Sequence, residues 1–236
     1  MKLLKIAALA APFALISAIA TPAMAQDEEE VAGPWEVDGE IAVFSDYRFR
    51  GVSLSGKNPQ LTAELAVSHE SGFYAGVWGS NVDLGSGNDE LEVDLYGGWT
   101  TDLGGVTLDV GALYYWYPGN DGFDYAEVYS SIGTTVAGAD LTLGVAYAPS
   151  QGALGNTDNI YVYAATEIPL GDTPFSLSGS IGLEDGAFGN SKVDWLVGLN
   201  MEVTSGVTAS VSYVDTARAG SNLGDPTALV SLAFSF

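Results

Sequence analysis

The sequence contains no cysteine, a single histidine and only seven lysine and arginine residues among its 236 positions. Without cysteine the chain has no disulfide framework, no thiol nucleophile and no cysteine-based zinc site. Thirty aspartate and glutamate residues oppose the seven basic ones, and the net charge of −23 disfavours nucleic acid as a partner. We therefore predict no cofactor, no metal centre and no nucleic-acid partner.

Helical periodicity is also missing beyond the N-terminal segment. Lys2 and Lys5 precede an apolar run, residues 6–20, that is too short to span a membrane as a helix. Ala23-Met24-Ala25 then has the small-residue spacing of a signal-peptide cleavage site. We predict a cleaved signal peptide over residues 1–25 and an acidic periplasmic leader over residues 26–34. The mature chain would then hold 236 − 25 = 211 residues and a net charge of 5 − 30 = −25.

What the sequence does have is alternation of apolar and polar residues with a period of two, which is the pattern of β-strands with one apolar face. The last segment, TALVSLAFSF, shows it clearly and stops on the aromatic Phe236. One segment, residues 73–82, has aromatic residues on both faces, so its orientation stays open. The alternating segments are residues 35–43, 61–67, 73–82, 91–100, 106–117, 125–132, 141–147, 160–168, 175–183, 193–203, 207–213 and 227–236.

Three features distinguish a membrane barrel from a soluble sandwich. The apolar faces of the twelve segments carry no charged residue, as a surface in contact with lipid requires. Outward aromatic residues fall mostly near the segment ends, at two levels, as in interfacial girdles. Long connections, at residues 45–60, 83–90, 118–123, 149–157, 184–191 and 216–226, alternate with short ones. We predict one domain, residues 35–236, that is a twelve-stranded antiparallel transmembrane β-barrel of the bacterial outer membrane.

Two motifs carry a resemblance to a known family. They are DYRFRG at Asp46–Gly51 and HESGFYAGVW at His69–Trp78. The segment around them resembles the TorF-type porin family, a proteobacterial family of unknown function, and the rest of the chain agrees with it in length and strand rhythm. The terminal Phe236 likewise resembles the assembly signal of outer-membrane proteins. The resemblance implies the barrel fold and the outer-membrane location, and it supplies no functional residue.

The inward faces of the predicted strands carry acids and tyrosines, which we take as candidate pore-lining residues. The only basic candidate on these faces is Lys192, so the lumen should favour cations. The tyrosines suit sugars or other polar solutes, but large rings can equally well fill a barrel of moderate size. The candidates are Glu36, Asp38, Glu40, Glu64, Glu92, Asp94, Asp109, Glu127, Glu167, Asp194 and Glu202, with Tyr115, Tyr117, Tyr125, Tyr129, Tyr161 and Tyr163.

Arg48 and Arg50, in the longest predicted connection, are candidates for a constriction or a plug. Both are among the five basic residues of the mature chain. Two alternatives stay open, since the direction of a loop cannot be read from the sequence. The arginines could fold inward against lumen acids, or they could lie on a solvated loop and bind lipopolysaccharide phosphates.

The predicted function is that of an outer-membrane porin-like channel for passive, cation-preferring uptake of small polar solutes. Its other partners would be membrane lipid, lipopolysaccharide and the outer-membrane assembly machinery. The alternative is a barrel without transport that serves a structural or interaction role. A lipid hydrolase is a third and weaker hypothesis, because the only histidine, His69, lies beside a short turn. We therefore predict no enzymatic activity.

Overall fold

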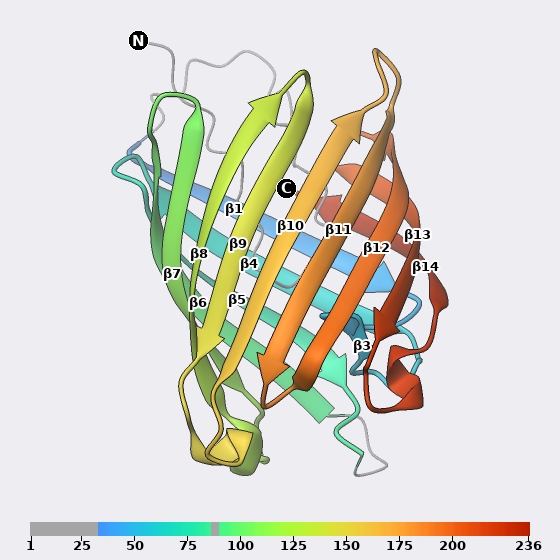
Figure 1. Cartoon of the computed structure of the whole chain (residues 1–236). Helices are drawn as coiled ribbons and strands as arrows, with labels where there is room; N and C mark the ends of the chain where they lie inside the picture. The colour runs from blue at the N-terminus through green and yellow to red at the C-terminus, as the bar shows by residue number, and fades with distance from the viewer. Residues whose placement is uncertain (1–32, 86–89) are drawn as a thin grey trace.

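Within residues 33–85 and 90–236, which the computed structural model describes, twelve strands form a closed barrel (Figure 1). Every neighbouring pair is antiparallel, and β1 closes the barrel against β14. This confirms the predicted fold. The predicted signal peptide and most of the leader lie outside the described residues. The barrel strands are β1 (Trp35–Phe44), β4 (Gln60–His69), β5 (Phe73–Val82), β6 (Glu90–Asp102), β7 (Val106–Trp116), β8 (Tyr125–Val136), β9 (Ala139–Ala148), β10 (Asn159–Pro169), β11 (Phe175–Gly186), β12 (Gly189–Thr204), β13 (Val207–Ala217) and β14 (Thr227–Ser235).

The two ends of the barrel differ in their connections. Five short turns, residues 70–72, 103–105, 137–138, 170–174 and 205–206, lie at the end where β1 begins and β14 ends, which we call the turn end. The opposite, loop end carries the longer connections (Figure 1). Three of these contain one-turn 3₁₀ helices: η1 (Asp121–Phe123), η2 (Gly152–Leu154) and η3 (Asn222–Gly224). No helix in the described part of the chain is long and apolar enough to cross a membrane.

One predicted long connection is wrong. We expected residues 184–191 to form a loop, but β11 runs on to Gly186 and β12 starts at Gly189. Gly186 has a φ of 124°, a conformation that favours glycine, and it pairs with Gly189 across the hairpin. The sequence pattern did not indicate strands in this hairpin, because its residues are mostly polar and the alternation of apolar and polar residues is lost there.

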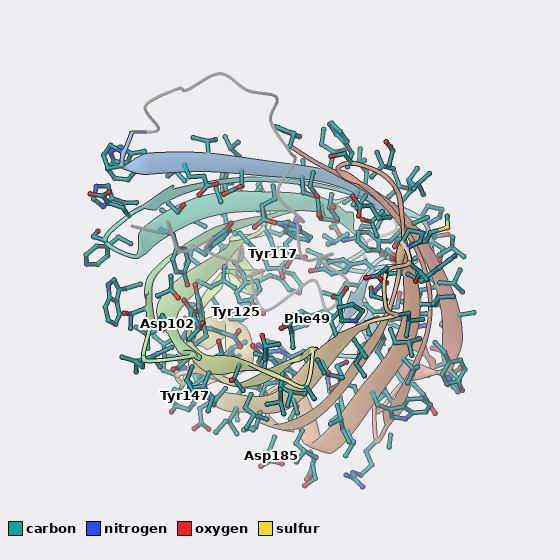
Figure 2. All side chains as sticks on the ribbon, turned by 90° about the horizontal axis from the view of Figure 1, so that it is seen from above. Phe49, Asp102, Tyr117, Tyr125, Tyr147 and Asp185 are labelled. Atoms are coloured by element: carbon teal, nitrogen blue, oxygen red, sulfur yellow. The ribbon has the colours of Figure 1, made fainter. Side chains whose placement is uncertain are left out.

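The alternation sorts the side chains as the sequence predicts, with large apolar residues exposed on the outer face. On β5, which the pattern left open, Phe73 and Val77 point outward and Trp78 is buried inside. In Figure 2 the labelled Phe49, Tyr117 and Tyr125 lie inside the ring of strands, and Asp185 lies outside it. Asp185 belongs to the loop-end extension of β11, beyond the segment predicted to be free of charge.

The last residue completes the closure of the barrel. Backbone hydrogen bonds join the Gly39 nitrogen to the Phe236 oxygen and the Phe236 nitrogen to the Gly39 oxygen, each 2.9 Å long. A Cβ atom at position 39 would lie 2.5 Å from the Phe236 ring, so only glycine leaves room for that ring on the outer face. The β1–β14 seam pairs five positions, Glu40–Phe44 with Ser231–Ser235, whereas β1 and β4 pair along ten.

Candidate functional site

The connection between β1 and β4, residues 45–59, folds into the barrel, and we call it the lumen segment. It contains the short antiparallel strands β2 (Arg48–Phe49) and β3 (Val52–Ser53). Arg50 and Gly51, with φ of 47° and 82°, form the two-residue turn between them, as type I′ hairpins require. Phe49 and Arg50 are 8% and 5% exposed. The structure therefore places the DYRFRG motif inside the lumen near the loop end (Figure 1).

Arg50 connects the lumen segment to two separate strands of the barrel wall. Its Nη2 atom lies 2.7 Å from Glu127 Oε2 on β8, and its Nη1 atom lies 2.8 Å from Glu184 Oε1 on β11. Lys192 pairs with the other oxygen of Glu184. Tyr161 places its ring 4.6 Å from the guanidinium carbon, within cation–π distance. Burial alone would lower the pKa of Arg50, but the two carboxylates raise it well above its ordinary value, so the guanidinium stays charged.

Arg48 holds the base of the same segment. Its Nε atom donates to Asp46 Oδ2 over 2.6 Å, and Nη1 donates to the backbone oxygen of Leu223 over 2.8 Å. Nη2 donates to the Thr227 hydroxyl at the start of β14. Arg48 therefore ties the lumen segment to the loop that contains η3, while Arg50 ties its tip to the far wall. These contacts answer the question of loop direction that the sequence left open.

All the predicted acids lie on inward-facing positions of the strands, but their exposure to solvent differs between the turn end and the loop end of the barrel. Glu36 and Glu202 are exposed at the turn-end rim, and Asp38, Glu40, Glu64 and Glu167 are half-buried. The other five are buried: Glu92, Asp94, Asp109, Glu127 and Asp194.

The basic residues of the described chain are confined to the loop end. They are Arg48, Arg50, Lys57, Lys192 and Arg218. Acids nearer the turn end of the lumen accept hydrogen bonds from hydroxyl groups instead. Asp109 accepts from Tyr74 over 2.7 Å, and Glu167 accepts from Ser176 over 2.7 Å. Glu40 and Glu64 lie directly opposite each other on β1 and β4. Among the described residues, no salt bridge reaches these four acids. The lumen thus has a mixed-charge loop end and an acidic middle and turn end.

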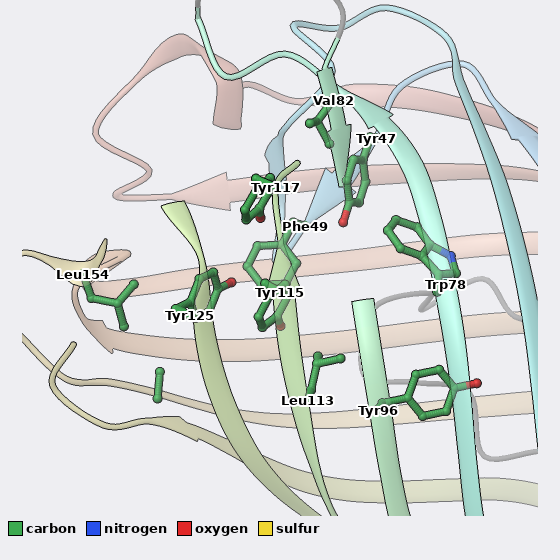
Figure 3. Packing of buried hydrophobic residues seen from close by; sticks show 11 residues of the cluster. Tyr47, Phe49, Trp78, Val82, Tyr96, Leu113, Tyr115, Tyr117, Tyr125 and Leu154 are labelled. Atoms are coloured by element: carbon green, nitrogen blue, oxygen red, sulfur yellow. The ribbon is translucent and has the colours of Figure 1, made fainter. Parts of the chain in front are cut away.

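The predicted tyrosines divide into two groups. Tyr115, Tyr117 and Tyr125 join the lumen segment's Tyr47 and Phe49 in a buried aromatic cluster at the loop end (Figure 3). Tyr115 stacks on Tyr125 with ring centroids 4.1 Å apart, and its hydroxyl donates to Glu127 over 2.9 Å. This group packs against the lumen segment rather than lining open water.

The remaining tyrosines lie against the barrel wall over glycines. Tyr129 faces Gly111 and Tyr163 faces Gly144 in direct cross-strand pairs, and Tyr161 covers Gly182 diagonally. Tyr96 over Gly76 repeats the arrangement on β5 and β6. An inward glycine opposite an inward tyrosine is the signal that our sequence analysis missed, because it appears only once the strand register is known.

We expect Gly144→Ala to destabilise the barrel by about 1–3 kcal/mol, the cost of overpacking a filled site. The added Cβ atom would lie 2.3 Å from the Tyr163 ring, which would have to turn away from the wall. Gly133→Ala is the matched control, since the nearest atom to its Cβ lies 3.8 Å away. The measurement is the temperature at which the folded band disappears in a heat-modifiability gel. Equal temperatures for both variants would contradict the packing described.

His69 belongs to the turn end and not to the lumen. Its Nδ1 atom lies 2.7 Å from Ser71 Oγ, and its ring packs at 4.5 Å against Trp35. Both contacts are local to the turn and the neighbouring strand start. No cluster of three or more histidine, cysteine, aspartate or glutamate residues in the described ranges could hold a metal ion.

Comparisons with known proteins agree with this architecture. A family model described as bacterial protein of unknown function (Gcw_chp) matches residues 28–236. The fold is similar to a solved KdgM porin, with TM-score 0.59, 7% identity, and 85% of this chain and 98% of that chain covered. It is also similar to the NanC porin (TM-score 0.54, 13% identity, 85% and 98% covered). A third similar structure is an outer membrane channel from Pseudomonas putida F1, with TM-score 0.52 and 8% identity. The match covers 84% of this chain and 94% of that chain. No curated protein matches in sequence.

Proposed function

We propose that this chain, which belongs to the Gcw_chp family of bacterial proteins of unknown function, is an outer-membrane channel for small polar solutes that prefers cations. A closed barrel with an apolar exterior supports the membrane location, because such a surface is stable only in lipid. The porin folds it resembles support a channel. The likeness of its DYRFRG and HESGFYAGVW motifs to TorF-type porins supports the barrel fold and the outer-membrane location.

The location in the outer membrane rests on further features. The signal peptide of residues 1–25 would deliver the chain to the periplasm, where Phe236 would act as the signal for the assembly machinery. The loop end would then face outward, as the long loops of outer-membrane barrels do, and contact lipopolysaccharide.

The observation that carries the cation preference is the uneven placement of charge. Every basic residue of the described chain lies at the loop end, while the middle and turn end of the lumen present carboxylates bonded to hydroxyls. Carboxylates along a pore attract cations and repel anions. A KdgM porin has been solved in complex with oligogalacturonate. The acidic lumen of this chain suits cationic or neutral solutes.

The lumen segment is the constriction in this proposal. It crosses the loop end of the lumen and is held by buried ion pairs, which leaves a filled interior at that height. The same observation favours the second candidate function, a barrel without transport that acts in structure or interaction. Conductance separates the two, because transport requires the lumen segment to leave a path or to move.

The test is a planar bilayer with a salt gradient. We expect a reversal potential that indicates cation preference, and a roughly twofold lower cation-to-anion ratio when Glu40→Gln and Glu64→Gln remove the facing carboxylates. Glu70→Gln is the matched control, because Glu70 lies in an exposed turn outside the lumen. Anion preference would defeat the proposal. So would the absence of conductance both in the native chain and in a chain with Arg50→Met.

A further inference from the structure

Two tyrosines on the inner face meet above a pair of glycines. Tyr74 on β5 lies directly opposite Gly98 on β6. Tyr129 on β8 lies directly opposite Gly111 on β7, which in turn pairs with Gly98. The hydroxyl oxygens of the two tyrosines lie 2.7 Å apart. The two rings therefore cross a section of wall four strands wide, and we call them the tyrosine platform.

Both rings lie flat along the wall. A Cβ atom at Gly98 would lie 2.4 Å from the Tyr74 hydroxyl oxygen. A Cβ atom at Gly111 would lie 2.3 Å from the Tyr129 hydroxyl oxygen, so each ring needs a glycine beneath it. Because one face of each ring covers the wall, the other face is turned to the lumen. Both tyrosines are half-buried, whereas Tyr115 of the loop-end cluster is 0% exposed, so solvent reaches the platform.

The hydroxyl protons of the platform are already used within the protein. Tyr74 donates its proton to Asp109 Oδ1 over 2.7 Å. The contact between the two hydroxyls must therefore use the proton of Tyr129. The platform is left with oxygen lone pairs and two aromatic faces, and both attract positive charge. An anionic ligand would gain no hydrogen bond from these two hydroxyls.

An acid beside the platform adds to this attraction. Glu64 on β4 accepts a hydrogen bond from Tyr96, whose ring centroid lies 6.4 Å from that of Tyr74. Glu64 is half-buried, so it stays within reach of solvent in the lumen. The lysines and arginines of the described chain all lie at the loop end, and none of them occupies the platform.

We propose that the tyrosine platform binds small organic ammonium ions, with the positive charge over the rings of Tyr74 and Tyr129 and with Glu64 as the counter-charge. The face of a tyrosine attracts a cation within about 6 Å of the ring centre, and more strongly where water is partly excluded. A metal ion such as calcium fits less well, because it takes 6–8 oxygen ligands and not an aromatic face. The inference rests on the proposed function only in making the ammonium ion a permeating solute.

The test is a calorimetric titration of the purified chain, in a nonionic detergent and a sodium chloride buffer, with tetramethylammonium chloride. This ion carries a charge but no hydrogen-bond donor, so its binding reports the aromatic faces and the nearby carboxylate. We expect saturable binding, and none of tert-butanol, a neutral molecule of similar shape. Tyr129→Leu should weaken binding about fivefold or more, as the loss of a cation–π contact does. Tyr213→Leu, on the outer face and 42% exposed, is the matched control and should bind as the native chain does.

Three results would overturn the inference: native-like affinity in Tyr129→Leu, equal binding of tert-butanol, or saturation by glucose at lower concentration than by tetramethylammonium. Heat-modifiability gels verify that each variant is folded. If Tyr129→Leu fails to fold, Tyr74→Leu combined with Asp109→Asn decides in its place, with the same expected weakening. The titration needs no conductance, so binding without conductance would refute the channel alone, and conductance without binding would refute this site alone.

Discussion

Replacing Val197 by arginine is expected to abolish insertion into the outer membrane, whereas arginine at Ser178 is tolerated. Val197 lies on the outer face of β12 and is 56% exposed, between Gly179 and Tyr213 of the neighbouring strands. An arginine on the lipid face costs about 2–4 kcal/mol at the midplane of the bilayer. Ser178 lies on the inner face of β11, where the side chain would meet the lumen.

The measurement is the amount of heat-modifiable protein in the outer-membrane fraction of cells that produce each variant. Both substitutions add the same charge on adjacent strands, so they differ mainly in the face that receives it. Normal insertion of both variants would mean that the apolar face does not meet lipid. Loss of both would point to a crowded lumen at Ser178 instead.

Replacing Arg50 by methionine is expected to raise single-channel conductance several-fold and to lower stability. The substitution leaves the carboxylates of Glu127 and Glu184 without their guanidinium, and breaking a buried pair in this way costs about 3–5 kcal/mol. Lys192 still pairs with Glu184, so the loss should fall mainly on Glu127. Released from the far wall, the tip of the lumen segment should leave a wider path.

Lys57→Met is the control, since Lys57 belongs to the same segment but forms only a 3.6 Å pair with Asp225 near the surface. Such exposed pairs contribute about 0–1 kcal/mol, and conductance should not change. Arg50→Met combined with Glu127→Gln should recover stability while keeping the higher conductance. If conductance stays at the native level in the folded double variant, the lumen segment is not the constriction.

The fold could be predicted because a lipid-facing barrel enforces one simple rule along every strand. Alternation placed Val197 outside and Asp194 inside without knowledge of the neighbouring strands. The rule fails where a strand leaves the membrane, and so the polar hairpin of residues 184–191 was predicted as a loop. It also failed for β5, where Phe73 and Trp78 lie on opposite faces.

The candidate site was predictable in its residue types but not in its contacts. The inward acids follow from alternation, yet the partner of Glu127 is Arg50, 77 positions away and on a loop. No local pattern specifies that pairing, because it depends on where the lumen segment folds. The contact between the Tyr163 ring and Gly144 could not be predicted from a local pattern either, because it depends on the register between two strands.

The seam between β1 and β14 has a consequence for the order of folding. It joins residues that are 236 − 39 = 197 positions apart, whereas every other seam joins two barrel strands that follow one another in the chain. Contacts between distant residues form slowly, because closing a long loop reduces chain entropy before any contact stabilises it. The other eleven strand pairs can therefore form first, as antiparallel hairpins that together make a curved open sheet. Until Phe236 reaches Gly39, that intermediate exposes two free edges, and the time it spends open is the period in which another chain could pair with it.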